Sequence, residues 1–344
     1  MKGRTIVLDH LGGREAAALL VDGRLDDLLI DDPAAPRPGT VFRALCDRGL
    51  KGQGGMMVRL PPDAPGGTGW LRDSKGLQAG QTVLVQVTGV AEPGKAVPVT
   101  DRLLLKSRYA IATPGAPGLN VSRAIRDEAE RERLLALAGE VVGEGLGLIL
   151  RSACEGAGAD AVAQDVEAMR DLARKVLGQA EGPPARLAEG DGPHLLAWRE
   201  WEAAEVVTKP GGFAREGVLE QIDALRSPHV PLGEGSLVVE PTRALVAVDV
   251  NTGGDTSPAA ALKANLAAAR TLPRQLRLRG LGGQVAVDFA SMPKGQRRQV
   301  EQSLRDAFRA DPIETSLVGW TALGLFELSR KRERAPTLRL LGDA

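Results

Sequence analysis

The stretch from Thr242 to Met292 reads TRALVAVDVNTGGDTSPAAALKANLAAARTLPRQLRLRGLGGQVAVDFASM, and it decides the fold. Two apolar runs rich in valine, 244–250 and 284–289, flank a segment at 259–279 in which leucines recur at helical spacing. A strand–helix–strand unit of this kind brings its two strands together in parallel. Parallel strands are usually covered by helices on both faces, so the sequence predicts an α/β sheet with buried strands.

Each apolar run carries an aspartate near its end that its apolar neighbours predict to be buried, Asp249 in the first and Asp288 in the second. Parallel strands end at one edge of a sheet, where open α/β sheets place their ligands. Two neighbouring carboxylates repel each other unless a cation neutralises them, and Mg²⁺ binds through one or two carboxylates plus waters. Asn251 could add an amide oxygen or orient a water. Turn and helix capping explains such aspartates equally well, so the residues alone leave both interpretations open.

Charge and composition restrict the class of protein. The chain carries 44 basic and 44 acidic residues, so any nucleic-acid site must be a local patch of positive charge. Its length of 344 residues allows two or three domains. No apolar run approaches the roughly 18 residues that a membrane helix needs. The N-terminus lacks a signal-peptide core, and Cys46 and Cys154 form no CxxC pair. We therefore expect a soluble, cytoplasmic protein with no membrane partner.

The rest of the chain shows several shorter elements. Alternating apolar and polar residues over 1–30 predict strands with a hairpin turn at Asp22-Gly23. Short runs between Gly/Pro turns from 40 to 113 predict a small barrel. Charged or amphipathic segments at 123–139 and 162–177 predict helices.

The segments ALVAVDVNTGGD, NLAAAR, RQLRLRGLGGQVAVDF and LGLFELSRKR resemble the catalytic core of the ribonuclease E/ribonuclease G family of bacterial endoribonucleases. The resemblance is dense over 235–332 and thinner, but collinear, from Met1. It implies that Asp249 and Asp288 hold a catalytic magnesium ion and that Asn251 supports them. It also implies cleavage of single-stranded RNA to 5′-phosphate and 3′-hydroxyl ends.

The resemblance further implies an α/β multidomain fold. An RNase-H-like scaffold would begin at 1–35 and resume, shortened, at 186–235. An OB-fold RNA-binding barrel would occupy 36–113, and a small 5′-sensor domain 114–185. A DNase I-like catalytic subdomain would occupy 236–344.

Residues that the resemblance implies for RNA binding are Phe42, Arg43, Trp70, Arg123, Arg277 and Arg279. Ordinary core packing explains the two aromatic residues equally well. Where the family tends to show Phe-Val-Asp-Tyr, this chain has MVRL at 57–60, so we expect weaker stacking, by about 1–3 kcal/mol per lost base. Arginines are frequent in the predicted helices at 259–279 and 293–309. They could form a path for a polyanion, or they could be the solvated faces of two surface helices. Pro273 should kink the first of these helices or cost it a hydrogen bond.

The motif GLGLILRS at 145–152 matches the family's sensor of the RNA 5′ end. By this resemblance Arg151 and Ser152 receive a 5′-monophosphate, which suits a guanidinium fork and a hydroxyl. A surface salt bridge is the alternative for Arg151. Another arginine of the family's receptor aligns with Glu314, whose charge would repel phosphate, so weak discrimination of the 5′ end is expected.

The sequence ends at Ala344, before the Cys-Pro-x-Cys zinc link and small domain of many family members. We therefore expect no zinc and either a monomer or a dimer formed through another surface. Two other functions stay open. One is a non-catalytic RNA-binding protein of the same fold, which the weakened barrel and shortened scaffold favour. The other is an unrelated magnesium-dependent phosphohydrolase.

Overall fold

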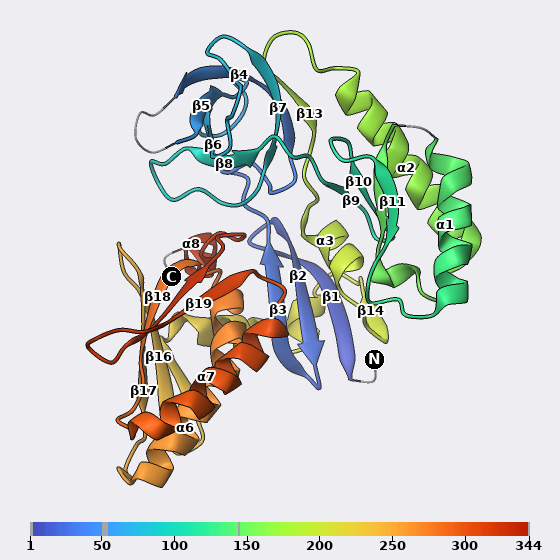
Figure 1. The fold of residues 1–344 in the computed structure, drawn as a ribbon. Helices are drawn as coiled ribbons and strands as arrows, with labels where there is room; N and C mark the ends of the chain where they lie inside the picture. The colour runs from blue at the N-terminus through green and yellow to red at the C-terminus, as the bar shows by residue number, and fades with distance from the viewer. Residues whose placement is uncertain (1–2, 50–53, 144, 343–344) are drawn as a thin grey trace. The chain divides into compact units, whose positions relative to one another are not determined.

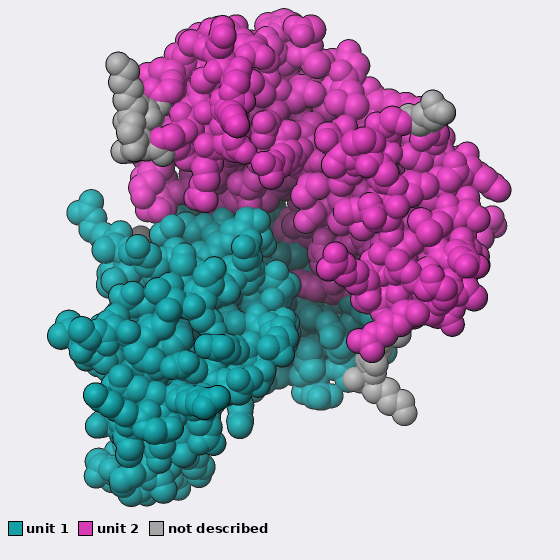
Figure 2. Space-filling view, in the orientation of Figure 1, with its two compact units in different colours: residues 1–31, 202–344 teal, residues 32–201 magenta. Residues whose placement is uncertain are grey.

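The computed structural model describes residues 3–49, 54–143 and 145–342. The chain divides into two compact units, one made of Met1–Asp31 with Glu202–Ala344 and the other of Asp32–Trp201 (Figure 2). Within the described ranges, no helix is long and apolar enough to cross a membrane.

The second unit contains a closed five-stranded barrel of the OB-like type that the sequence predicts (Figure 1). The barrel closes because its first strand, at 41–49, pairs with its fourth, at 82–87. An additional strand, β13 (Ala185–Ala188), pairs with the first strand. Its core holds Phe42, Val58, Leu71 and Val85. The five strands are β4 (Val41–Gly49), β5 (Met56–Arg59), β6 (Thr68–Leu71), β7 (Thr82–Val87) and β8 (Val97–Thr100).

A separate sheet in the same unit has the order β11-β12-β10-β9. Its strands are β9 (Leu105–Lys106), β10 (Ala110–Thr113), β11 (Gly118–Val121) and β12 (Gly147–Leu150). Helices α1 (Glu128–Val142) and α2 (Ala159–Leu177) share one hydrophobic core with it, and α3 (Pro193–Glu200) follows β13. The predicted barrel boundary at residue 113 is wrong, because β9 and β10 pair with this sheet. Helix α1 begins later than predicted because the Asp127 carboxylate caps it, accepting from the Glu130 N–H.

The first unit opens with a small sheet of order β14-β1-β2-β3. Asp22 and Gly23 adopt positive φ angles of 49° and 74°, which confirms the predicted hairpin turn. Helices α4 (Gly212–Arg215) and α5 (Val218–Asp223) contribute to its core, and an RNase-H-like identity stays a prediction. The strands are β1 (Arg4–Leu11), β2 (Arg14–Val21), β3 (Arg24–Ile30) and β14 (Glu205–Val207).

The six-stranded sheet of this unit contains the two strands of the stretch from Thr242 to Met292. Its order is β15-β16-β17-β18-β20-β19, and β17 and β18 pair in parallel, as predicted. Helix α6 (Pro258–Leu278) connects these two strands, and α7 (Lys294–Arg309) lies beside it (Figure 1). The strands are β15 (His229–Leu232), β16 (Gly235–Pro241), β17 (Val246–Asn251), β18 (Gly283–Asp288), β19 (Thr315–Trp320) and β20 (Phe326–Arg330).

The expectation that helices cover both faces of this sheet is wrong. Val246, Val248 and Val250 are buried in the core shared with α6 and α7, whereas alternate residues of β17 point to the opposite face. Every other strand pairing in the sheet is antiparallel, and antiparallel sheets commonly leave one face to solvent. Helix α6 continues beyond Pro273 to Leu278, so this buried proline does not end the helix.

Candidate active site

The two predicted aspartates are direct partners across the parallel ladder. Asp249 of β17 lies opposite Asp288 of β18, in the same register that pairs Val248 with Val287. Adjacent strands lie about 4.8 Å apart, so the two carboxylates are close neighbours. Both side chains are exposed, which corrects the expectation that they are buried. They project from the uncovered face of the sheet, where a long substrate has access.

The surroundings leave these charges without a basic partner. Neither Asp249 nor Asp288 forms an ion pair with lysine or arginine in the part of the chain that the structure describes. The Asn251 Nδ2 atom donates a 2.7 Å hydrogen bond to Oδ2 of Asp249, which orients that carboxylate and leaves the amide oxygen available. Two carboxylates repel each other unless a cation lies between them.

This donor set suits a hard divalent cation, because carboxylate and amide oxygens are the ligands such ions prefer. Among the described residues, no group of three or more His, Cys, Asp or Glu side chains could hold a metal. Two carboxylates completed by water fit Mg²⁺, which keeps several waters when it binds to proteins.

Asn265 lies on α6 and is fully buried, and no sequence motif singled it out. Its Nδ2 donates to the Ala290 carbonyl at 2.8 Å, and its Oδ1 accepts from the Ala290 N–H at 2.9 Å. Ala290 lies two residues beyond Asp288, so α6 holds the chain where it leaves β18. The signal in the sequence was an amide at helical spacing from alanine and leucine residues of a predicted helix.

Arg277 and Arg279 do not form the exposed RNA-binding surface predicted for them, since both are buried. Arg277 forms ion pairs with Asp311, with Asp26 at 3.1 Å and with Asp27 at 3.4 Å. Arg279 donates to the carbonyl oxygens of Leu225 at 2.5 Å and Ser227 at 2.9 Å. These contacts stabilise the interior of the first unit.

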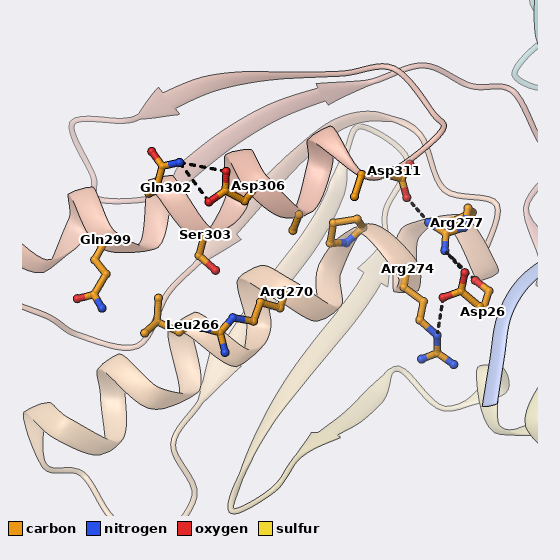
Figure 3. A pocket seen from close by; sticks show the side chains of 13 residues that line it. Asp26, Leu266, Arg270, Arg274, Arg277, Gln299, Gln302, Ser303, Asp306 and Asp311 are labelled. Atoms are coloured by element: carbon orange, nitrogen blue, oxygen red, sulfur yellow. Dashed lines mark hydrogen bonds and ion pairs between the residues drawn. The ribbon is translucent and has the colours of Figure 1, made fainter. Parts of the chain in front are cut away.

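A groove of about 660 Å³ lies between α6 and α7, where a basic path was one of the two interpretations of the sequence (Figure 3). Gln302 donates to both oxygens of Asp306 on the α7 side, and burial lowers the pKa of Arg274 on the α6 side to about 10. Because its charged lining is balanced, the groove has no electrostatic preference for a polyanion. The charged residues that line it are Asp26, Asp306, Asp311, Arg270, Arg274 and Arg277.

Two of the predicted barrel contacts serve the barrel itself. Phe42 is fully buried in the core, so its ring cannot stack on a base. Arg43 donates to the carbonyl oxygens of Gln179, Glu181 and Pro183 at 2.6–2.7 Å and thereby holds that segment against the barrel. The assignment of Phe42 to RNA binding is corrected, and that of Arg43 stays a prediction.

Trp70 and Arg123 keep the surface positions that RNA contact requires. Trp70 is half-buried on β6 and lies opposite Met57 of β5, and Arg123 is exposed in the turn after β11. Their roles stay predictions.

Arg151 forms a salt bridge, which was the alternative to phosphate binding. Its Nη2 lies 2.5 Å from Oε2 of Glu200, and its Nη1 donates to the Ser107 carbonyl at 2.6 Å. Burial raises the pKa of Glu200, but the charges of Arg151 and Arg199 outweigh burial and hold that pKa below its usual range. A carboxylate therefore occupies the edge of the guanidinium on which a phosphate was expected, while Ser152 stays exposed.

The fold and the site define a class of multidomain α/β proteins with an OB-like barrel and a carboxylate pair on an open sheet face. The chain matches the model of the Ribonuclease E/G family over residues 104–208 and 202–333. It is 32% identical over 307 residues to ribonuclease E of Nostoc sp. strain PCC 7120, covering 76% of this chain and 44% of the relative. It is 31% identical over 302 residues to ribonuclease G of Escherichia coli K12, covering 75% and 61%.

The chain therefore belongs to the ribonuclease E/G family. A third relative, ribonuclease E of Synechocystis sp. strain PCC 6803, is 31% identical over 306 residues, covering 76% of this chain and 45% of the relative. The chain thus spans roughly half the length of these curated relatives, from 44% to 61%.

Proposed function

We propose that this protein is a magnesium-dependent endoribonuclease that cuts single-stranded RNA. The observation that carries the proposal is the register pairing of Asp249 with Asp288 on an open sheet face, without a basic partner in the described chain. Family membership supplies the substrate class, since the relatives are named ribonucleases.

In this proposal Asp249 and Asp288 hold the ion, which when bound activates a water and stabilises negative charge at phosphorus. Asn251 holds one oxygen of Asp249 in place. Asn265 fixes the backbone beyond Asp288 and is a positioning residue. Attack of water at phosphorus with departure of the 3′ oxygen, which takes up a proton, would give products with 5′-phosphate and 3′-hydroxyl ends.

The uncovered face of the sheet supports internal cleavage, because a chain can cross it without threading an end into a closed pocket. Trp70 of the barrel and Arg123 are the predicted contacts whose exposure supports RNA binding. The sheet order β14-β1-β2-β3 supports the RNase-H-like scaffold, and the two-helix, six-stranded layer supports the DNase I-like subdomain.

A second candidate is RNA binding without catalysis. The burial of Phe42 and the bonds of Arg43 to the 179–183 segment favour it over cleavage, because they leave the barrel few groups with which to hold a strand in place at a catalytic site.

The test replaces Asp249 and Asp288 by asparagine, singly and together, which removes charge but keeps shape. The substrate is an AU-rich, single-stranded, 5′-monophosphorylated oligonucleotide, with and without Mg²⁺. We expect each change to slow cleavage roughly a hundredfold or more, since a metal contributes several kcal/mol to the transition state. Glu240→Gln, on the same sheet face, is the control for general charge removal and should cleave normally.

Thermal unfolding should be nearly unchanged in the aspartate variants, because both side chains are exposed. A double variant that cuts RNA at the parental rate would show that the metal assignment is wrong. A parental protein that binds RNA but does not cut it under any divalent ion would support the binding-only function.

A further inference from the structure

An exposed tryptophan lies in the second unit, outside the barrel. Trp198 of α3 is 49% exposed, in a chain whose aromatic content is only 3%. The Arg108 guanidinium lies over its ring at 5.1 Å from the ring centre and also lies 5.9 Å from the centre of the Tyr109 ring. A planar cation therefore covers part of one aromatic surface while much of the indole remains open.

Several contacts hold this arrangement rigid. Arg108 donates to the Trp198 carbonyl, and Arg199 donates to the Lys106 carbonyl at 3.4 Å. Arg151 joins the same two segments, through the Ser107 carbonyl and the Glu200 carboxylate. These contacts join the turn before β10 to the end of α3, and we call the two joined segments the frame. An aromatic ring held in this way loses little conformational entropy when a ligand binds to it.

Some of the arginines in this frame form ion pairs with carboxylates and one does not. Arg151 is neutralised by Glu200, and Arg199 by Glu200 and Asp191. Asp165 is held by the Ser107 hydroxyl and the Tyr109 N–H. Arg108 forms no ion pair with a carboxylate within the described chain, so its positive charge remains uncompensated beside the open indole.

We propose that Trp198 and Arg108 form a stacking site for a base of single-stranded RNA, with Arg108 also attracting the adjoining phosphate. The inference rests on the proposed function for its substrate class. An exposed indole accepts any base, because every base has a π-face, and an unpaired guanidinium supplies the charge that the backbone needs. The site performs the role that the buried ring of Phe42 cannot perform.

The test measures the affinity of the full-length protein for a 3′-labelled, 5′-hydroxyl oligouridine by fluorescence anisotropy in EDTA. A matched oligonucleotide with abasic riboses separates base stacking from phosphate contacts. The variants are Trp198→Ala and Trp198→Phe, which keeps an aromatic ring. The control is Leu195→Ala, which removes a 50% exposed apolar side chain one helical turn away.

We expect Trp198→Ala to weaken oligouridine binding about 5- to 100-fold, the range for loss of one stacked base. Trp198→Phe should retain most of the affinity, and Leu195→Ala should bind like the parent. The abasic oligonucleotide should bind the parent and Trp198→Ala equally.

Unchanged oligouridine binding by Trp198→Ala, or an equal loss with the abasic oligonucleotide, would overturn the proposal. A change in mass by light scattering without a change in RNA affinity would also overturn it and would assign the ring to contact between protein copies. If the parent cleaves RNA while Trp198→Ala binds normally, only the stacking site fails. If the parent binds RNA through Trp198 but does not cleave it, only the catalytic proposal fails.

Discussion

Replacing Asn265 by alanine tests whether the buried amide positions the metal site. The change removes the 2.8 and 2.9 Å hydrogen bonds to Ala290 and leaves its N–H and C=O without their partner. An unsatisfied, partly buried group costs about 1–3 kcal/mol, so the two together should destabilise the protein by roughly 2–6 kcal/mol.

The same change should weaken metal binding, because Asp288 lies two residues before the released residue. Loss of a residue that orients a metal ligand typically lowers metal affinity about 10- to 100-fold. We therefore expect Asn265→Ala to need a correspondingly higher Mg²⁺ concentration for half-maximal cleavage. The assay is a Mg²⁺ titration of initial rate, accompanied by direct titration with Mn²⁺ followed by electron paramagnetic resonance.

Leu272→Ala is the matched control, because Leu272 lies on the same helix and in the same core. Its loss costs about 2–5 kcal/mol, so both variants lose similar stability. Only Asn265→Ala should shift the Mg²⁺ requirement. Equal shifts in the two variants, or no shift in either, would refute the positioning role and leave Asn265 as a structural residue alone.

Two further predictions concern charge. Glu200→Gln removes the negative partner of Arg151 and should raise the ratio of initial rates on 5′-monophosphorylated and 5′-hydroxyl RNA; an unchanged ratio would show that Arg151 does not receive the phosphate. For Asp27, burial raises the pKa, but the charges of Arg334 and Arg277 outweigh burial and lower it overall. Its stabilisation is therefore present above the unfolded pKa of about 3.9 and is lost as the pH falls through the lower folded pKa. Urea unfolding of Asp27→Asn should show a shallower loss of stability below about pH 4 than the parent, and identical slopes would contradict this.

The pairing of the aspartates could be predicted from the sequence because the two strands repeat one pattern. Val-Ala-Val-Asp occurs at 246–249 and again at 285–288, and the structure aligns the two tetrapeptides residue for residue. The exposure of the aspartates was also readable, since alternation places Asp249 on the face opposite Val248 and Val250. The prediction of burial failed because alanine in the alternate positions made each strand look apolar throughout.

The role of each arginine could not be predicted, because a guanidinium's function depends on partners remote in sequence. Arg277 pairs with Asp26, which lies 251 residues away, and Arg43 bonds carbonyl groups about 140 residues away. No local pattern distinguishes such arginines from Arg123, which is exposed. Helical periodicity predicted where the arginines lie along the helices but not which carboxylates they face.

Ion pairs within each unit explain how the net charge of zero affects RNA binding. Arg151, Arg277 and Arg330 are each neutralised by a carboxylate within their own unit, so much of the positive charge is used internally. An RNA-binding surface built from the remaining cations can release few counterions, and counterion release is the usual source of nonspecific affinity. Base stacking must then supply a larger share of the binding free energy. In the proposed function that share falls to the partly exposed rings of Trp70 and Trp198, because Phe42 is buried. We therefore expect the protein to bind single-stranded RNA, whose bases are accessible, better than a duplex.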